Sequence, residues 1–445
     1  MTADQPDLPS HSDLPSHSDG SELSGRSDEP DRSGRVDLSA AFDRTDTLLP
    51  VPAVQNHAAN LTVLPGGDLG CVWFGGTQEG MADICVWFSR LTPDATTWTD
   101  PILLSDDPAR SEQNPLLFPA PSGALWLLHT AQRGGDQDTA EVRLRVSHDN
   151  GVTWDAPRTL FPATPGSGGV FVRQPPVVLP TGRLLVPVFR CRTTPGEKWS
   201  GDLDTSAVMI SDDQGDTWRE QPVPASTGLV HMNVHRLPDG SLLALFRSRR
   251  ADVVHRSVSL DDGDTWSEPE PLDLPNNNCS IQYLPLTDGR LALVYNHSSA
   301  ADATARRVSL YDEIDDKGGL ADDRAPAGGT TTAVGRETEP PEPPKPSELP
   351  EASEAVPRAS EAVPGAFWGA PRAPLSLAIS SDGGRTWPLR TDLVTGDGHC
   401  LTNNSRDGLN RELSYPSIAQ TPDGALHIAY AHHRQVIRHI RLLPR

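Results

Sequence analysis

Short apolar stretches alternate with polar turns along most of the chain, and none of them has a helical period. The clearest are VVLPTGRLLVPVF (177–189), VHRLPDGSLLALF (234–246) and YLPLTDGRLALVY (283–295). Each places a glycine between two apolar or β-branched runs, which is typical of a β-hairpin whose tight turn needs a positive φ. The pattern therefore predicts an all-β protein.

The hairpin turn recurs six times when it is counted by its glycine. The glycines are Gly67, Gly123, Gly182, Gly240, Gly289 and Gly424. Their spacings are 56, 59, 58, 49 and 135 residues, and the last falls to about 80 once residues 312–365 are set aside. A period near 55 residues with roughly four strands per unit favours a six-bladed β-propeller.

A second repeat, S-x-D-x-G-x-T-W, occurs without gaps at 147–154, 211–218, 259–266 and 380–387. It lies between the third and fourth expected strands of a blade. Its aspartate can accept backbone N–H bonds, its glycine suits a left-handed position and its tryptophan can pack on the neighbouring sheet. We predict a structural role for this box. The last blade ends one strand short, so a segment just before Asn56 is expected to complete it.

Charge separates two further segments from the propeller. The net charge is -22; residues 1–47 carry 11 acidic and 4 basic groups, and residues 312–365 carry 13 and 5. Both segments are rich in proline and serine and are expected to be disordered. The predicted organisation is a tail at 1–47 and a propeller at 48–445, interrupted by an insert at 312–365. The remainder is only mildly acidic, which argues against nucleic acid as a partner.

The chain opens without a signal-peptide pattern and has no run of about 18 apolar residues, so the default expectation is a cytoplasmic protein that does not bind a membrane. Five cysteines without a C-x-x-C pair favour buried free thiols over disulfides or a zinc cluster. No metal or cofactor is predicted.

The innermost strands of a propeller surround a central channel, so the residues that enter them mark its mouth. Positions 8 to 11 residues before the turn glycines are all polar: His57, Asn114, Gln174, His231, Asn278 and Tyr415. Arg173 and Glu412 are charged neighbours of these positions. The stretch WFGGTQEGMADI (73–84) adds Glu79, and Arg247 follows the apolar run LLALF. A guanidinium has a planar fork of donors that suits a carboxylate, so a pocket for an acidic ligand is predicted.

Four boxes on a six-blade repeat resemble the Asp boxes of the sialidase (neuraminidase) superfamily, over roughly 50–311 and 366–445. The stretches HAANLTVLPGGDLGCVWFGGTQEG, EQNPLLF, PNNNCSIQYLPLTDGRLALVYNHS and LSYPSIAQTPDGALHIAYAHHR together are similar to a bacterial subgroup of BNR-repeat proteins. The resemblance implies a glycosidase for an acidic sugar or glycoconjugate. In that superfamily three arginines clamp the carboxylate, a tyrosine assisted by a glutamate attacks, and an aspartate protonates the leaving group.

Carried over by position, the resemblance implies Tyr415 in LSYPSI as the nucleophile, Arg247 and Arg372 as the second and third arginines, and Asp83 in EGMADI as the acid. The chain departs from the pattern twice. His57 stands where the first arginine is expected, and His231 replaces the glutamate 16 residues before Arg247.

His231 and Glu412 are the candidates for the base that assists Tyr415, since a phenol with a pKa near 10 needs a partner to lose its proton. His57, Arg173, Asn114, Gln174, Asn278 and Glu79 are candidate substrate-binding residues. Three functions follow. The first is a retaining hydrolase. The second is a uronic-acid lyase, in which His57 or His231 removes the proton α to the carboxylate. The third is a sugar- or protein-binding propeller without catalysis.

Overall fold

The computed structural model describes residues 41–445 except 165–167, 195–196, 308–364 and 404. The disorder predicted for residues 1–40 and 312–364 therefore lies outside the described residues.

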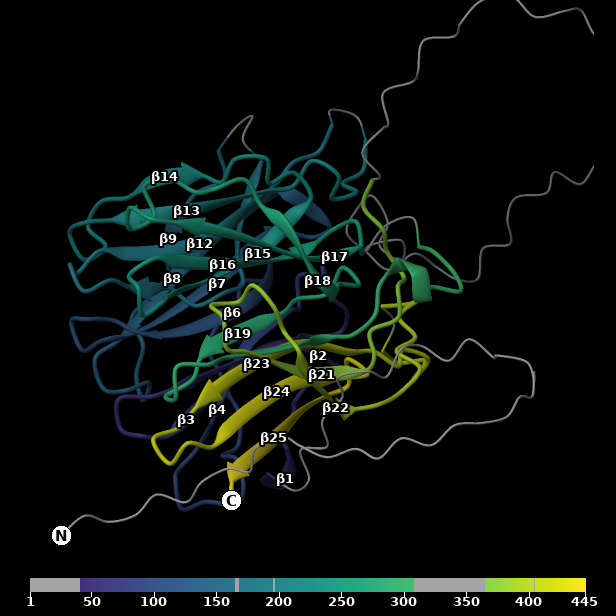
Figure 1. Cartoon of the computed structure of the whole chain (residues 1–445), viewed down its shortest axis with the longest axis horizontal. Coiled ribbons are helices and arrows are strands. Elements are labelled where there is room, and N and C mark those ends of the chain that lie inside the picture. Colours follow the sequence, from purple (N-terminus) through teal and green to yellow (C-terminus); the bar gives the residue numbers. More distant parts are fainter. Residues whose placement is uncertain (1–40, 165–167, 195–196, 308–364, 404) are drawn as a thin grey trace, which may run out of the picture. The chain divides into compact units, whose positions relative to one another are not determined.

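The described strands form six antiparallel sheets, which are the blades of a six-bladed β-propeller (Figure 1). Blades 1 to 3 are β2 (Gln55–Val63), β3 (Leu69–Gly76), β4 (Cys85–Leu91) and β5 (Ile102–Leu103); β6 (Ser111–Pro119), β7 (Leu125–Arg133), β8 (Asp136–Ser147) and β9 (Arg158–Phe161); and β10 (Gly169–Val172), β11 (Val177–Val178), β12 (Leu184–Cys191), β13 (Thr205–Ser211) and β14 (Arg219–Pro222). Blades 4 to 6 are β15 (Leu229–Arg236), β16 (Leu242–Ser248), β17 (Val253–Ser259) and β18 (Glu270–Pro275); β19 (Gln282–Pro285), β20 (Leu291–Asn296), β21 (Leu375–Ser380) and β22 (Leu389–Val394); and β23 (Leu413–Gln420), β24 (Leu426–His432), β25 (Val436–Pro444) and β1 (Phe42–Leu48). A short 3-10 helix, η2 (Ala300–Asp302), follows β20.

Blade 6 is completed from the N-terminal side, as the sequence predicted. Strand β1 pairs antiparallel with β25, from Phe42 opposite Pro444 to Leu48 opposite Arg438. Because β1 begins at Phe42, residues 42–47 belong to the propeller, although the charge pattern had placed them in the tail. The pairing covers the edge of β25 that would otherwise expose unpaired backbone groups.

Hydrophobic clusters occupy the seams between successive blades. One cluster, for example, joins Leu64 and Phe88 of blade 1 to Leu117 and Leu127 of blade 2. Equivalent clusters lie between blades 2 and 3, 3 and 4, 4 and 5, and 5 and 6. A sixth joins blade 6 back to blade 1 and includes Trp73. Burial at these seams closes the sheets into a ring, because each sheet covers the apolar face of the next.

Both repeated turns have the predicted geometry. All six turn glycines have a positive φ, between 82° and 92°. In the box at 211–218, the Asp213 carboxylate accepts hydrogen bonds from the backbone N–H and the hydroxyl of Thr217, and Ser211 Oγ accepts one from the N–H of Gly215. Gly215 has a φ of 100°, and a Cβ there would lie 2.7 Å from Trp126 of the preceding blade. The box is thus a structural turn that packs closely against its neighbour.

Candidate active site

The innermost strands of four blades carry an irregularity where they enter the channel. The pairing register shifts between His57 and Asn60, Gln113 and Leu116, Val230 and Asn233, and Ser414 and Ser417. At each shift a residue nine positions before the turn glycine has a φ of 51° to 55°: Ala58, Asn114, His231 and Tyr415. A β-bulge turns side chains away from the regular alternation of a strand. Four sequence-distant segments thereby present side chains that a regular strand would direct elsewhere.

Tyr415 and Arg247 form the centre of the site. Arg247 Nη1 donates to the Tyr415 hydroxyl oxygen at 2.7 Å and lies 3.4 Å from Nε2 of His231, while Arg247 Nε donates to Asn278 Oδ1 at 2.9 Å. Arg247 is fully buried and Tyr415 is 6% exposed. Burial lowers the pKa of Arg247 to about 10, so the guanidinium keeps its charge at neutral pH. Blades 4, 5 and 6 therefore meet at one cation.

Beside this centre, a buried chain of alternating charges runs from Arg372 to Glu79. Arg372 Nη1 lies 3.3 and 3.2 Å from the two Glu412 oxygens. Arg434 Nε donates to Glu412 at 2.7 Å, and Arg434 Nη1 donates to Glu79. Burial acts to raise the pKa of Glu412, but Arg372 and Arg434 outweigh it and lower the pKa to about 2. Glu412 is thus an anion at neutral pH, and it fixes two guanidinium groups.

Two histidines flank the tyrosine ring. The ring centroid of His57 lies 4.3 Å from that of Tyr415, and His231 lies at 5.5 Å in an edge-on arrangement. Burial lowers the pKa of His57 and of His231 well below the usual value, and nearby arginines lower both further. Both imidazoles are therefore neutral at pH 7.

Arg173 lies in the same cluster, but its donors face protein oxygens. It donates to the backbone carbonyls of Ala58, Ala59 and Tyr415 at 3.1 to 3.3 Å and to the hydroxyl of Ser280. These carbonyls include those of two left-handed residues at the strand irregularities. Arg173 thus ties blades 1, 5 and 6 together behind the tyrosine.

Two guanidinium donors in the cluster are unpaired. Neither Nη2 of Arg247 nor Nε of Arg372 has a hydrogen-bond partner among the described residues, and both atoms are buried. Unpaired buried donors on a charged group are costly, which favours an anion that could accept from both. The guanidinium carbons of Arg247 and Arg372 lie 5.6 and 5.8 Å from the Tyr415 ring centroid. An anion bound here would sit next to the phenol.

The segment that precedes Arg372 covers Arg247. The carbonyl of Phe367 accepts from Asn278 Nδ2 at 2.9 Å, and the Phe367 N–H donates to the carbonyl of Arg249. The Trp368 ring lies 5.8 Å from the Arg247 guanidinium carbon. The cluster is therefore enclosed on this side by protein.

The remaining predicted residues lie in different settings. Gln174 donates to the carbonyl of Ile281 at 2.6 Å, and buried Asn114 has a left-handed backbone. Glu79 belongs to the charge chain through Arg434. Asp83 is exposed and accepts from the backbone N–H and the hydroxyl of Thr77. Its role as the acid stays a prediction from the resemblance.

Sequence reasoning missed Arg434 and a second buried pair, Arg249 with Asp204. Arg434 lies in the turn between β24 and β25, where His433 and Arg434 both have a positive φ without being glycine. Such a turn normally requires asparagine or glycine, so the HHRQ stretch carried a weak signal. Arg249 donates two bonds to Asp204 and stacks 5.1 Å from the Trp199 ring centroid.

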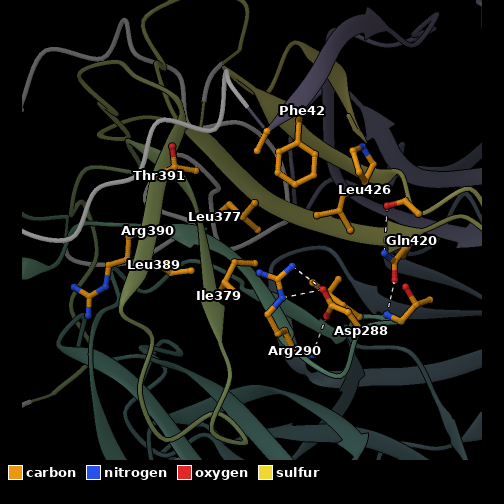
Figure 2. A pocket seen from close by; sticks show the side chains of 15 residues that line it. Phe42, Asp288, Arg290, Leu377, Ile379, Leu389, Arg390, Thr391, Gln420 and Leu426 are labelled. Carbon is orange, nitrogen blue, oxygen red and sulfur yellow. Dashed lines mark hydrogen bonds and ion pairs between the residues drawn. The ribbon is translucent and has the colours of Figure 1, made fainter. Parts of the chain in front are cut away.

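A more apolar cavity of about 480 Å³ lies between blades 5 and 6, away from this cluster. Figure 2 shows Phe42, Leu377 and Leu426 around it, with the ion pair of Asp288 and Arg290 at its edge. It is also lined by Gln420, which is at the opposite end of β23 from Tyr415. This cavity has none of the chemistry of the channel cluster.

The five cysteines all lie in the part of the chain that the structure describes. All five cysteines are free thiols; four are buried and Cys85 is half-buried. In the part of the chain that the structure describes, no three His, Cys, Asp or Glu residues are grouped to hold a metal ion. Nor does any helix within the described ranges have the length and apolar character needed to cross a bilayer.

Solved structures with this fold include several sialidases. A Hadza microbial sialidase matches with a TM-score of 0.58 at 14% identity, covering 88% of this chain and 66% of that one. The leech intramolecular trans-sialidase complexed with 2,7-anhydro-Neu5Ac matches at 0.54 and 13%, covering 87% and 68%. A protein of unknown function from Dyadobacter fermentans DSM 18053 matches at 0.60 and 16%, covering 91% and 100%. At these identities the likeness concerns the fold.

Two curated proteins match parts of the sequence. The anhydrosialidase of Macrobdella decora is 25% identical over 200 residues, which is 42% of this chain and 25% of that protein. Vacuolar protein sorting/targeting protein 10 of Fusarium vanettenii is 29% identical over 156 residues, which is 34% of this chain and 10% of that protein. The matched region thus spans at most a quarter of either relative.

The BNR repeat-like domain family matches residues 67–428, a range that includes all six turn glycines and all four boxes. The chain therefore belongs to the BNR repeat-like domain family, and its six-bladed propeller has the fold of the sialidases.

Proposed function

We propose that the protein is a retaining glycoside hydrolase of the sialidase type that acts on a terminal sugar bearing a carboxylate. One observation carries the proposal: Arg247 and Arg372 each have a buried donor without a partner among the described residues, and their guanidinium carbons lie 5.6 and 5.8 Å from the Tyr415 ring centroid. The names of the structural neighbours and of the Macrobdella decora relative support the same class of substrate.

The geometry suits the chemistry in two respects. A guanidinium offers parallel donors to a carboxylate and remains charged when buried, so the two arginines can orient an acidic sugar. A neutral phenol avoids the repulsion that a carboxylate nucleophile would feel from that anion. In the first step Tyr415 Oη bonds to the anomeric carbon as the glycosidic bond breaks, and the leaving oxygen takes a proton from an acid, the role that the resemblance assigns to Asp83. Water then cleaves the tyrosyl-sugar bond and restores the phenol.

The test is a panel of α- and β-glycosides of sialic and uronic acids. We expect release of the acidic sugar with retained configuration at the anomeric carbon, measured by NMR during turnover. A folded protein that binds members of the panel but releases no reducing end would overturn the hydrolase assignment and leave a binding propeller.

A uronic-acid lyase is the second candidate, and the histidines favour it. The Tyr415 hydroxyl is bonded by Arg247, and within the described residues no carboxylate contacts it; its ring neighbours are the neutral His57 and His231. A neutral imidazole can remove a proton α to a carboxylate that an arginine has neutralised. The two reactions differ in product, because elimination leaves an unsaturated sugar that absorbs ultraviolet light. Turnover without a gain in absorbance excludes the lyase.

A further inference from the structure

We propose that His57, rather than His231 or Glu412, is the general base of the site, and that Ser414 and Glu412 fix its reactive tautomer. The inference deepens the proposed function and rests on it for the identity of the reacting group. It follows from the direction of four hydrogen bonds around Tyr415.

The hydroxyl of Ser414 determines which nitrogen of His57 carries hydrogen. Ser414 Oγ donates to Glu412 Oε1 at 2.5 Å and lies 3.4 Å from His57 Nδ1. A hydroxyl has one hydrogen, and Glu412 takes it, so Ser414 can only accept from His57. Glu412 Oε1 itself lies 3.9 Å from His57 Nδ1, which also favours a hydrogen on that nitrogen. His57 therefore carries its proton on Nδ1.

Nε2 of His57 is consequently the nitrogen with a free lone pair. It is buried and has no hydrogen-bond partner among the described residues. The imidazole lies against the phenol, with ring centroids 4.3 Å apart. Burial and the surrounding arginines lower the pKa of His57 well below its usual value, so the imidazole is neutral at pH 7 and Nε2 carries no proton before the reaction. A substrate carboxylate bound by Arg247 and Arg372 would offset part of this positive charge and raise the pKa of His57.

His231 has the opposite arrangement. Arg247 can only donate, and its Nη1 lies 3.4 Å from His231 Nε2, so that nitrogen is the acceptor. The hydrogen of neutral His231 is then on Nδ1, which has no partner in the described part of the chain. His231 presents an N–H where His57 presents a lone pair. Glu412 is excluded as the base because both of its oxygens are engaged by Arg372, and one also by Arg434 and Ser414.

The proton balance of the reaction needs these groups together with the acid, the role that the resemblance assigns to Asp83. Arg247 donates to the oxygen of Tyr415, which leaves the phenolic hydrogen free to move. As Tyr415 Oη bonds to the anomeric carbon, its proton passes to His57 Nε2. The electron pair of the glycosidic bond leaves with the departing oxygen, which takes its proton from the acid assigned to Asp83. His57 then holds hydrogen on both nitrogens, and the negative charge of Glu412 stabilises the imidazolium through Ser414. In the second step the Asp83 carboxylate takes a proton from the attacking water, and His57 returns its proton to the phenol.

Ser414, Glu412 and Arg434 are positioning residues in this scheme. Arg434 donates to Glu412 from a turn whose two central residues both have a positive φ. Such a conformation is strained for residues other than glycine, and strain of this kind is maintained where it orients a functional group. Arg434 also donates to Glu79, and Arg372 pairs with Glu412. The Glu412 carboxylate, which accepts from Ser414, is therefore held by two arginines.

The activity test compares three variants on the best substrate of the panel. His57→Gln is expected to lower kcat about 10²- to 10⁴-fold, the range typical for removal of a general base. Ser414→Ala leaves the imidazole in place and is expected to lower kcat about ten- to a hundredfold with KM nearly unchanged. His148→Gln, at a side chain that is 74% exposed, is the matched control and should retain full activity. Turnover of folded His57→Gln within twofold of the wild type would overturn the proposal.

A second readout does not depend on turnover. In protein labelled with ¹⁵N-histidine, nitrogen chemical shifts distinguish protonated from unprotonated ring nitrogens. In Ser414→Ala the His57 Nδ1–H loses its acceptor, so a difference spectrum between this variant and the wild type identifies the His57 resonances. We expect protonated Nδ1 and unprotonated Nε2 at pH 7. A wild-type protein that turns over no member of the panel overturns the proposed function, whereas a His57 protonated on Nε2 overturns the assignment of the base even in an active enzyme.

Discussion

The outer turns and the central channel of this propeller use the same side-chain types in opposite ways. In the box at 147–154 the Asp149 carboxylate bonds Thr153 and Ser147 at the surface, and the arrangement recurs in three other blades. In the channel the Glu412 carboxylate is 1% exposed and pairs with Arg372 and Arg434. Glu412 lies twelve residues before its turn glycine, and at that position the other five blades have no acidic residue.

Asp149 and Glu412 differ in how far apart in the sequence their partners lie. These hydrogen bonds lower the pKa of Asp149 to about 2, because the side chain and backbone of Thr153 both donate to it. Each such bond is local and spans only a few residues. Glu412, by contrast, connects segments from blades 5 and 6 through long-range ion pairs. Repetition thus indicates a structural turn, whereas the contacts of Glu412 do not repeat and hold a single cluster in the channel.

Tyr415→Phe should give the largest effect and tests the channel half of the comparison. The substitution removes one oxygen, which is the proposed nucleophile, while the ring still packs between His57 and His231. We expect kcat to fall by about 10³-fold or more with little change in the thermal midpoint. Rates on the best panel substrate and a melting curve measure the two. Activity retained in the folded variant would remove Tyr415 as the nucleophile.

Glu412→Gln comes next, because it should damage the fold as well as the site. The amide leaves Arg372 and Arg434 buried without their anion, and loss of one partner from a buried ion pair typically costs about 3 to 5 kcal/mol. We expect a large fall in the free energy of unfolding, measured with denaturant, together with loss of turnover. A change of less than about 1 kcal/mol would mean that the charge chain contributes little to stability.

The fold was predictable because its signals repeat. Six turn glycines and four boxes fix the number of blades, the position of each hairpin and the outer turn, and the structure confirms all three. The closing strand was also inferred from the missing fourth strand of blade 6. The start of this strand at Phe42 was not predicted, because the charge of the flanking residues resembles that of the tail. Local composition does not indicate which residues a distant strand will pair with.

The site was predictable only in part. The count back from each turn glycine located Tyr415, His231 and His57, because the strand irregularities recur nine residues before the glycine. Arg434 was missed, since it reaches the centre from a turn rather than from an innermost strand. The direction of the hydrogen bonds around His57 was also beyond the sequence, because it depends on the single hydrogen of Ser414 and on which neighbour takes it.

Acid should reduce the stability that Glu412 contributes in the channel and that Asp213 contributes in its outer turn. Both contributions should be lost over the same pH range, but the loss should be larger for Glu412. The pKa of Glu412 and of Asp213 is lowered to about 2, and an unfolded carboxylate has a pKa near 4. A group whose pKa is lower in the folded state stabilises the protein above its unfolded pKa, and this contribution is lost as the pH falls towards the folded pKa. We therefore expect the thermal midpoint to fall between about pH 4 and pH 2.

Glu412→Gln should flatten this acid dependence clearly, because the lost charge is buried between two guanidinium groups. Asp213→Asn should flatten it only slightly, because the surface carboxylate is screened by water. Thermal midpoints of the three proteins at a series of pH values give the comparison. Equal flattening by both substitutions would show that the buried pairing contributes no more than a surface turn.

Asp213→Ala should have the smallest effect and tests the outer half of the comparison. The substitution removes the acceptor of the Thr217 N–H and hydroxyl, but the box remains at the surface, where water can replace the lost bonds. We expect the thermal midpoint to fall by only a few degrees, with kcat and KM unchanged. The seam between blades 2 and 3 should persist, since Trp218 still packs 5.2 Å from Phe161. A fall in kcat without a fall in stability would contradict a purely structural role for the box, because it would couple an outer turn to the chemistry of the channel.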